Sequence, residues 1–407
     1  MKKVIVTVGT SIFENYLKID KSNTNFKNAY FFFKDNKKTA SDLDRESVRK
    51  RDIEKVFNES YFENGGENVC AEIKSLLAIK KELREGFDIY LISSDTAMGR
   101  LAAEIIKNAI RNYYPEFSDC ELEIFKVSNL QVWDRKKFDD GMTELINTIY
   151  NIANSDWDNV VINISGGYKA TIPYITMLGQ INKCPIYYIF EDTDSLIKIP
   201  YIPIDLNWKI FEENFSFLKE LEKEDIKELD KSFNHRSELF SLLEEVEDND
   251  SSKFLYSLNP LGKALWLKFR EKFHIFNLST LAFEELEKLD YNSKDIIERS
   301  LLELHRRLYS NPSDPDLNHL LLDYGFRVFK HKEDNLQVRI AYKIDKYQSK
   351  ITNGNVYDIY IGLFAVGSDV HNSGNEYVED FKQKIDKVKD INEYKPYIIK
   401  KEVYKHV

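Results

Sequence analysis

Short apolar runs that end in small polar residues recur three times in the first half of the chain. Residues 3–8, 90–92 and 160–164 are rich in valine, isoleucine and leucine, which predicts buried strands of a parallel sheet. Helical patterns follow, most clearly over Ala97 to Arg111. Because the carboxyl ends of parallel strands meet at one edge of a sheet, we expect the three following loops to form one polar crevice.

The third of these strands runs into a helix through a glycine pair. Ser165, Gly166 and Gly167 let the backbone pass close to a ligand and direct the first amides of the helix outward. Lys169 would lie in the first helical turn, where the helix dipole favours anions, so it is suited to a bound phosphate. An ordinary turn with a solvated lysine is the alternative. The candidate ligand-binding residues of the three loops are Gly9, Thr10, Ser11, Ser93, Ser94, Asp95, Thr96, Ser165, Gly166, Gly167 and Lys169.

Two nucleotide-binding motifs are missing from these loops. None carries the Lys-Ser/Thr pair of a P-loop, and the chain has no GxGxxG fingerprint. The loops therefore do not favour an ATPase or a dehydrogenase.

The middle of the chain is predicted to be mostly helical, with a short extended piece before Asn259-Pro260. Apolar residues recur at near-helical spacing from Phe215 to Ile226 and again from Leu239 to Val246. Residues 211–250 contain 14 acidic and 5 basic side chains, which would repel a DNA duplex. We therefore interpret residues 201–271 as a winged-helix-like linker and dimerisation domain rather than a DNA reader.

The last third has the pattern of a compact α+β domain. A strand at 273–278 is followed by two amphipathic helices, and three alternating segments are expected to pair as an antiparallel meander. The predicted helices are 281–289 and 295–308, and the segments are 325–329, 336–344 and 357–366.

Composition limits the classes of protein that the chain can belong to. Its 407 residues, with 43% hydrophobic and 31% charged side chains, predict two or three soluble globular domains. No apolar run is long enough to span a bilayer and Met-Lys-Lys leads into a strand, so a cytoplasmic protein is expected. The three cysteines are far apart, which predicts buried thiols and neither disulfides nor a metal site. Although the net charge is -10, residues 326–346 carry six basic against three acidic side chains, which predicts a local basic surface.

Two stretches of the first half resemble a known sensor family. VTVGTS near the amino terminus and NISGGYKATIPYIT near residue 170 resemble the CARF domain, the Rossmann-like sensor of CRISPR-associated effectors. The resemblance covers residues 1–200 and implies a homodimer that binds one cyclic oligoadenylate, such as cyclic tetra-adenylate, across its two-fold axis. Residues 18–60 form an insertion rich in aromatic residues after the first strand, suited either to covering the bound ligand or to adding contacts within the dimer.

The last third resembles the RelE family of ribosome-dependent mRNA interferases. FHIFNLSTLAFEELEKLD, VRIAYKID and YIGLFAVG carry this resemblance, and the corresponding domain is 272–407. It implies that the ribose 2′-hydroxyl attacks the adjacent phosphate of mRNA in the ribosomal A site, without a metal or cofactor. The positions that match the family's functional residues are Arg339, Arg327, Lys330, Lys332 and Tyr377, with His371 in place of a missing arginine.

Together, the resemblances imply a CRISPR-associated endoribonuclease that is switched on by cyclic oligoadenylate and acts on mRNA at the ribosome. Two alternatives stay open at this point. Arg299 and His305 have the spacing of the HEPN ribonuclease motif, although a HEPN fold is all-helical and we expect these two residues on a solvated helix face. The second alternative is a regulator without enzymatic activity that acts through the middle of the chain.

Overall fold

A computed structural model describes residues 1–63, 70–189, 195–229, 237–246, 254–333, 336–367 and 376–400. The chain divides into two compact units. Unit 1 comprises residues 1–206 and 258–265, and unit 2 comprises residues 207–257 and 266–407. Both units mix helices with sheets, in agreement with the predicted mixed α/β class.

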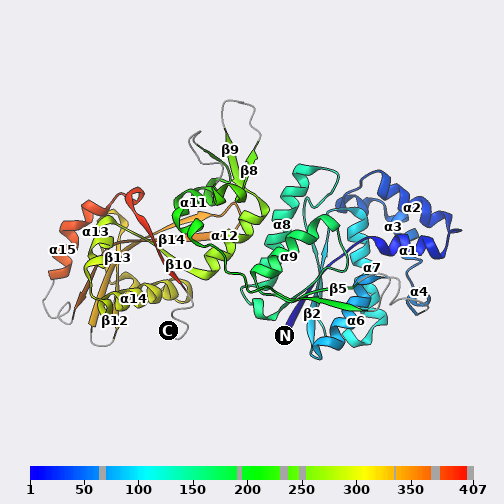
Figure 1. Ribbon diagram of the computed structural model, residues 1–407, viewed down its shortest axis with the longest axis horizontal. Coiled ribbons are helices and arrows are strands. Elements are labelled where there is room, and N and C mark those ends of the chain that lie inside the picture. The colour runs from blue at the N-terminus through cyan, green and yellow to red at the C-terminus, as the bar shows by residue number, and fades with distance from the viewer. Residues whose placement is uncertain are drawn as a thin grey trace. The chain divides into compact units, whose positions relative to one another are not determined.

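Unit 1 is built on a six-stranded sheet with the order β3-β2-β1-β4-β5-β6 (Figure 1). The first five strands are parallel and β6 is antiparallel to β5. This order places β1 between β2 and β4, so the chain reverses its direction across the sheet at β1. The strands are β1 (Lys2–Thr7), β2 (Phe87–Ser93), β3 (Leu122–Lys126), β4 (Val160–Asn163), β5 (Ile186–Ile189) and β6 (Leu196–Ile199).

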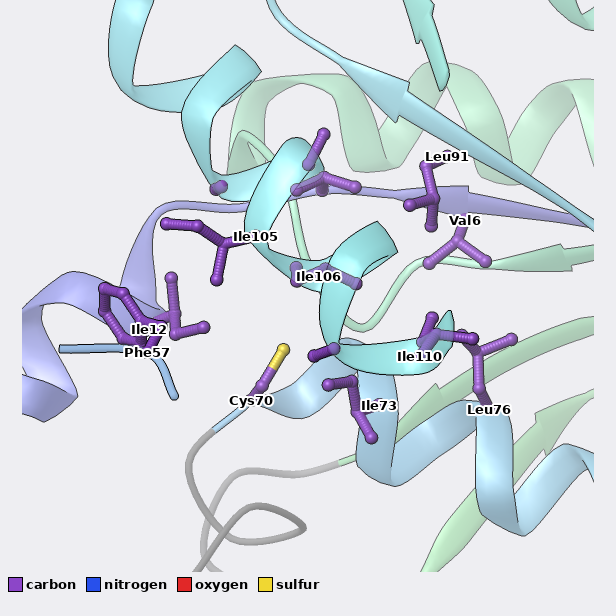
Figure 2. Packing of buried hydrophobic residues seen from close by; sticks show 14 of the residues in the cluster. Val6, Ile12, Phe57, Cys70, Ile73, Leu76, Leu91, Ile105, Ile106 and Ile110 are labelled. Carbon is purple, nitrogen blue, oxygen red and sulfur yellow. The ribbon is translucent and has the colours of Figure 1, made fainter. Parts of the chain in front are cut away.

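Helices cover both faces of this sheet because its strands are apolar on both sides. Figure 2 shows Val6 of β1 and Leu91 of β2 beside Ile106 and Ile110 of α7, in the same hydrophobic cluster. A Cβ on Gly179 of α9 would lie 2.6 Å from the side chain of Ile186, so α9 packs closely on the sheet. The helices are α1 (Ser11–Ile19), α2 (Thr24–Asp35), α3 (Ser47–Glu54), α4 (Glu59–Glu63), α6 (Ala71–Leu83), α7 (Ala97–Tyr113), α8 (Arg135–Ala153) and α9 (Ile172–Ile181).

The aromatic insertion forms part of the core of unit 1. Phe26, Tyr30 and Phe57 are buried and pack with aromatic side chains of α1. Ion pairs fasten the insertion to α7, with Arg100 contacting Asp44 at 2.8 Å and Lys50 contacting Glu104 at 2.6 Å. The described insertion is therefore a helical lobe packed on α1 and α7 of unit 1.

Unit 2 begins with the middle segment, which carries a three-stranded sheet of order β7-β9-β8. Phe215, Leu218 and Leu221 are buried, as their helical spacing predicts. The helical spacing from Leu239 to Val246 was misleading, because this stretch forms a short 3-10 helix and then a strand that pairs within the small sheet. The elements are α10 (Lys209–Glu213), α11 (Phe215–Glu224), β7 (Lys227–Glu228), β8 (Leu243–Val246), β9 (Leu255–Leu258) and α12 (Pro260–Lys272), of which residues 260–265 belong to unit 1.

The main sheet of unit 2 has the order β11-β12-β13-β14-β10-β15 (Figure 1). The predicted order of one strand, two helices and an antiparallel meander is observed, and β10 pairs parallel to β14. The elements are β10 (Phe273–Leu278), α13 (Thr280–Lys288), α14 (Tyr291–Ser310), β11 (Leu320–Leu321), β12 (Arg327–Glu333), β13 (Leu336–Gln348), β14 (Asn355–Gly367), α15 (Glu376–Lys384) and β15 (Lys395–Lys400).

Alternation along β13 separates two apolar layers. Val338, Ile340 and Tyr342 pack in one hydrophobic cluster with side chains of α13 and α14. Ala341 belongs to a second cluster on the other face, which includes Phe381 of α15. The residues of β13 that alternate with Val338 and Ile340 therefore lie on the α15 side of the sheet.

Candidate functional site

The loops after β1 and β4 meet at the point where the strand order of unit 1 reverses. The Thr7 hydroxyl donates a hydrogen bond to the Gly166 carbonyl oxygen at 2.6 Å. A Cβ on Gly9 would lie 2.9 Å from the Gly167 nitrogen, and Gly167 has a φ of 95°, a conformation that favours glycine. Such a reversal point is where open α/β sheets bind ligands. The contacts support the predicted pairing of these two loops.

The amino terminus of α1 opens directly from the first loop. Thr10 occupies the N-cap position, but its side chain makes no capping hydrogen bond. Thr10 and Ser11 are both partly exposed. Their hydroxyls and the adjacent amides lie where the helix dipole attracts anions, which suits a phosphate group.

Lys169 follows the glycine pair in a 3-10 turn, Lys169–Thr171, that precedes α9. It therefore lies just before α9, not in the first turn of that helix as predicted. Its side chain is exposed and has no recorded hydrogen bond or ion pair with any residue that the structure describes. Lys169 is thus available to an anion at the crevice.

The side chains of the loop from Ser93 to Thr96 are buried or bonded to other residues of unit 1. The Thr96 hydroxyl accepts a hydrogen bond from the Gly99 amide at 3.0 Å and lies 3.0 Å from the Ser94 hydroxyl, so both contribute to the start of α7. Ser93 is fully buried. Asp95 forms an ion pair with Lys126 at 3.5 Å and accepts from the Asn129 amide. The geometry gives this loop a structural role.

Ser165 is also used internally. Its hydroxyl donates to Asn163 Oδ1 at 2.6 Å and accepts from the Ile189 amide at 3.0 Å. Of the predicted set, the side chains left for a ligand are those of Thr10, Ser11 and Lys169, together with the backbone of the glycine loops.

Glu72, near the start of α6, is a crevice residue that the sequence did not single out. Its side chain is 1% exposed, and its Oε1 atom accepts a hydrogen bond from the Gly9 amide at 2.7 Å. The Cys70 thiol donates to Oε2 at 3.0 Å, and burial raises the pKa of this thiol well above its ordinary value. A glutamate in a first helical turn is common, so the sequence signal for Glu72 was no stronger than that of a favourable helix start.

The second candidate site centres on Arg339, in the middle of β13. Its side chain is 0% exposed and lies on the α15 side of the sheet. Nη1 donates to the Val338 carbonyl at 2.9 Å and Nη2 to Gln337 Oε1 at 3.2 Å. Within the part of the chain that the structure describes, Nε has no hydrogen-bond partner and no carboxylate pairs with this guanidinium. A buried cation with an unused donor is suited to an anionic ligand.

The structure brings Tyr377 of α15 to Arg339. The Arg339 guanidinium carbon lies 5.5 Å from the centre of the Tyr377 ring, which is a cation–π contact. Tyr377 also packs edge-on against Phe381, which is buried in the same cluster. These contacts bring the α15 side chains onto the guanidinium, so an incoming phosphate requires movement at Tyr377.

The remaining predicted effector residues fall on both faces of the sheet. Lys330 pairs directly with Arg339 across the ladder, and alternation places Lys332 on the same face. Arg327 pairs with Tyr342 and lies on the opposite face. There, burial raises the pKa of the Tyr342 hydroxyl and the charge of Arg327 opposes this shift. His371 lies outside the described residues.

Arg299 and His305, the residues with HEPN spacing, lie on α14. Arg299 forms an ion pair with Asp295 one helical turn away. His305 is not on a solvated face as expected, because its ring packs between those of His274 and Tyr309 at centroid distances of 4.5 and 4.6 Å. The six-stranded sheet in the same unit is incompatible with an all-helical HEPN domain.

A buried charge network at the far end of the same sheet was not predicted. Glu222 of α11 pairs with Arg270 of α12 at 3.1 Å, and Lys219 pairs with Asp358 of β14 at 2.8 Å. Burial alone would lower the pKa of Arg270, but Glu222, Tyr347 and Asp358 raise it. Because breaking such a pair leaves a buried charge, the network anchors the middle segment on the sheet.

The described residues contain no group of three or more His, Cys, Asp or Glu side chains placed to hold a metal ion. Among them, too, no helix combines the length and the apolar character that crossing a membrane requires. All three cysteines are buried thiols outside any disulfide bond, as predicted.

Part of unit 1 is similar to a known protein family. Residues 67–202 match the family model described as CRISPR-associated protein (Cas_APE2256). The match includes Glu72, the β4 loop and Lys169, and it supports the predicted association of the chain with CRISPR systems. No curated protein matches the chain.

Proposed function

We propose that the protein is a CRISPR-associated endoribonuclease in which unit 1 is a CARF sensor for cyclic oligoadenylate and unit 2 contains a RelE-like effector that cleaves mRNA in the ribosomal A site. The observation that carries the effector assignment is Arg339, a buried arginine with an unused donor beside Tyr377. In this proposal the protein acts in the cytoplasm as a homodimer, with ribosome and mRNA as partners.

The sensor proposal rests on the crevice at the reversal point. Thr10, Ser11 and the α1 amino terminus offer donors to a phosphate, and Lys169 adds a positive charge just after the glycine pair that meets the β1 loop. A cyclic oligoadenylate such as cyclic tetra-adenylate carries one phosphate per nucleotide and matches this chemistry. The match to a CRISPR-associated family supports the assignment.

The proposed reaction is a transesterification within the RNA. The 2′-hydroxyl gives up its proton as its oxygen bonds to the adjacent phosphorus, the bond from phosphorus to the 5′-oxygen breaks, and the leaving 5′-oxygen takes up a proton. Negative charge accumulates on the phosphorane, where the Arg339 guanidinium can stabilise it, assisted by Lys330 and Lys332 on the same face. Tyr377 and His371 are the proposed proton-transfer groups. The products are a 2′,3′-cyclic phosphate and a 5′-hydroxyl.

Analysis of the RNA ends tests this reaction. We expect ribosome-bound mRNA cleaved by the activated protein to carry a 2′,3′-cyclic phosphate on the upstream fragment. A 5′-phosphate on the downstream fragment would exclude 2′-hydroxyl attack and overturn the proposal.

The HEPN alternative predicts a different mutational result. We expect Arg299→Ala and His305→Ala to leave cleavage within about twofold of the unmodified protein, because neither side chain lies on the Arg339 face of the sheet. The measurement is the initial cleavage rate at saturating activator, after the melting temperature of each variant has been checked. Loss of activity in both folded variants would favour a HEPN-like site.

A further inference from the structure

Glu72 places a carboxylate directly beneath the loops that we propose bind phosphates. It contacts both loops at once: Oε1 accepts from the Gly9 amide at 2.7 Å, and a Cβ added to Gly166 would lie 1.9 Å from the same oxygen. Gly9 and Gly166 lie in the loops that follow β1 and β4, which are neighbouring strands at the reversal point. The carboxylate therefore holds the two halves of the crevice in register.

Away from the crevice, the Glu72 side chain is next to buried apolar residues. Figure 2 shows Cys70, which donates to Oε2, among the apolar side chains of Ile73, Ile105 and Ile106. The Gly9 amide and the Cys70 thiol are uncharged donors, so neither of them neutralises the carboxylate. The contact with Glu72 also occupies the Gly9 amide, which is then not available to a phosphate.

A buried carboxylate and an anionic ligand repel each other. Charges in a partly buried site interact through an effective dielectric constant of about 20, so a separation of several ångström corresponds to an effect of roughly tenfold or more on binding. Thr10, Ser11 and Lys169 attract the ligand at the same crevice. The affinity of the crevice for the ligand then depends on the attraction by these groups and the repulsion by Glu72.

We propose that Glu72 sets the affinity of the crevice for its ligand: the side chain positions the Gly9 and Gly166 loops, and its charge weakens the binding of phosphates so that the activator can be released. This inference rests on the proposed function, in which the crevice binds cyclic oligoadenylate. It assigns to Glu72 a positioning and affinity-limiting role, without direct contact with the ligand.

Two substitutions separate the charge of Glu72 from its contacts. Glu72→Gln keeps an oxygen that accepts from the Gly9 amide and removes the charge, so the dissociation constant for cyclic tetra-adenylate should fall roughly tenfold. Glu72→Ala removes the acceptor as well and should bind more weakly than Glu72→Gln. Glu82→Gln, an exposed site on the same helix, is the matched control and should change the constant less than about twofold. Calorimetric titration measures all four proteins.

A measurement on the unmodified protein covers the case in which Glu72→Gln does not fold. Unit 1 contains no histidine and burial raises the pKa of the Cys70 thiol, so carboxyl groups are the side chains of this unit that take up protons between pH 7 and pH 5. A bound anion disfavours the charged form of Glu72, and affinity should therefore increase as the pH falls through this range.

The outcomes distinguish the two levels of the proposal. If the unmodified protein binds no cyclic oligoadenylate of any ring size, the sensor assignment fails and this inference with it. If it binds, and folded Glu72→Gln binds equally or more weakly, Glu72 has only a structural role and the inference alone is wrong. A pH-independent affinity of the unmodified protein would overturn it in the same way.

Discussion

Arg339→Ala is expected to lower ribosome-dependent mRNA cleavage by about 100-fold or more, the largest effect of any single substitution in the chain. The guanidinium is positioned by Val338 and Gln337 and keeps one unused donor, so it can stabilise charge that develops on the scissile phosphate. Single-turnover cleavage of ribosome-bound mRNA at saturating activator measures the loss.

Three controls make this result specific. The affinity for cyclic oligoadenylate should not change, because Arg339 belongs to unit 2 and the ligand crevice to unit 1. Arg299→Ala removes the same kind of side chain from α14, where it pairs with Asp295, and should stay active. Since Arg339 is fully buried, the melting temperature of the variant must be compared with that of the unmodified protein. Full activity of folded Arg339→Ala would remove the effector assignment.

Lys169→Ala is expected to have the largest effect on the sensor, weakening cyclic oligoadenylate binding by roughly tenfold or more at low salt. A charge-assisted contact to phosphate is lost, and a ligand bound across the two-fold axis of a homodimer would lose this contact twice. Thr10→Ala should weaken binding less, because it removes one neutral hydrogen bond. Titration with rings of different size measures both.

The matched control for Lys169 is Lys81→Ala, an exposed lysine in the last turn of α6, at the other end of the helix from Glu72. It removes the same charge and should leave affinity within about twofold. Both variants should remain dimeric if the protein is a homodimer, since these lysines are solvated. Equal losses from Lys169→Ala and Lys81→Ala would mean that the ligand senses only the overall charge.

The order of elements could be predicted because it depends on local patterns. Buried strands with glycine and serine at their ends indicated the parallel sheet of unit 1, and alternation indicated the meander of unit 2. These signals also predicted that the loops after β1 and β4 meet, as the close approach of Gly9 to Gly167 shows. The strands β5 and β6 were not predicted because each has only four residues, and β15 was not predicted because its partner β10 lies far earlier in the sequence.

The use of individual polar groups could not be predicted in the same way. Whether Thr96 binds a ligand or caps α7 depends on where its hydroxyl points once the helix has formed. Arg327 and Arg339 look equivalent in the sequence, but the register of β12 against β13 places them on opposite faces. Glu72 reaches the crevice only because α6 packs beneath two loops that are 63 and 94 residues away.

Burial of Arg339 is likewise a tertiary property. A sequence with arginine between Val338 and Ile340 suggests a solvent-facing residue on an alternating strand. The cover comes from α15, which follows β14 and packs Phe381 into the same face. In the proposed function, this cover has to move before Arg339 can reach a phosphate.

The most direct test of the account is cleavage of one mRNA by the purified protein in four conditions: free or bound to ribosomes, each with and without cyclic oligoadenylate. We predict rapid cleavage only on ribosomes with the activator present. Cleavage of free RNA at the same rate, or ribosomal cleavage that does not respond to any cyclic oligoadenylate, would contradict the central claim.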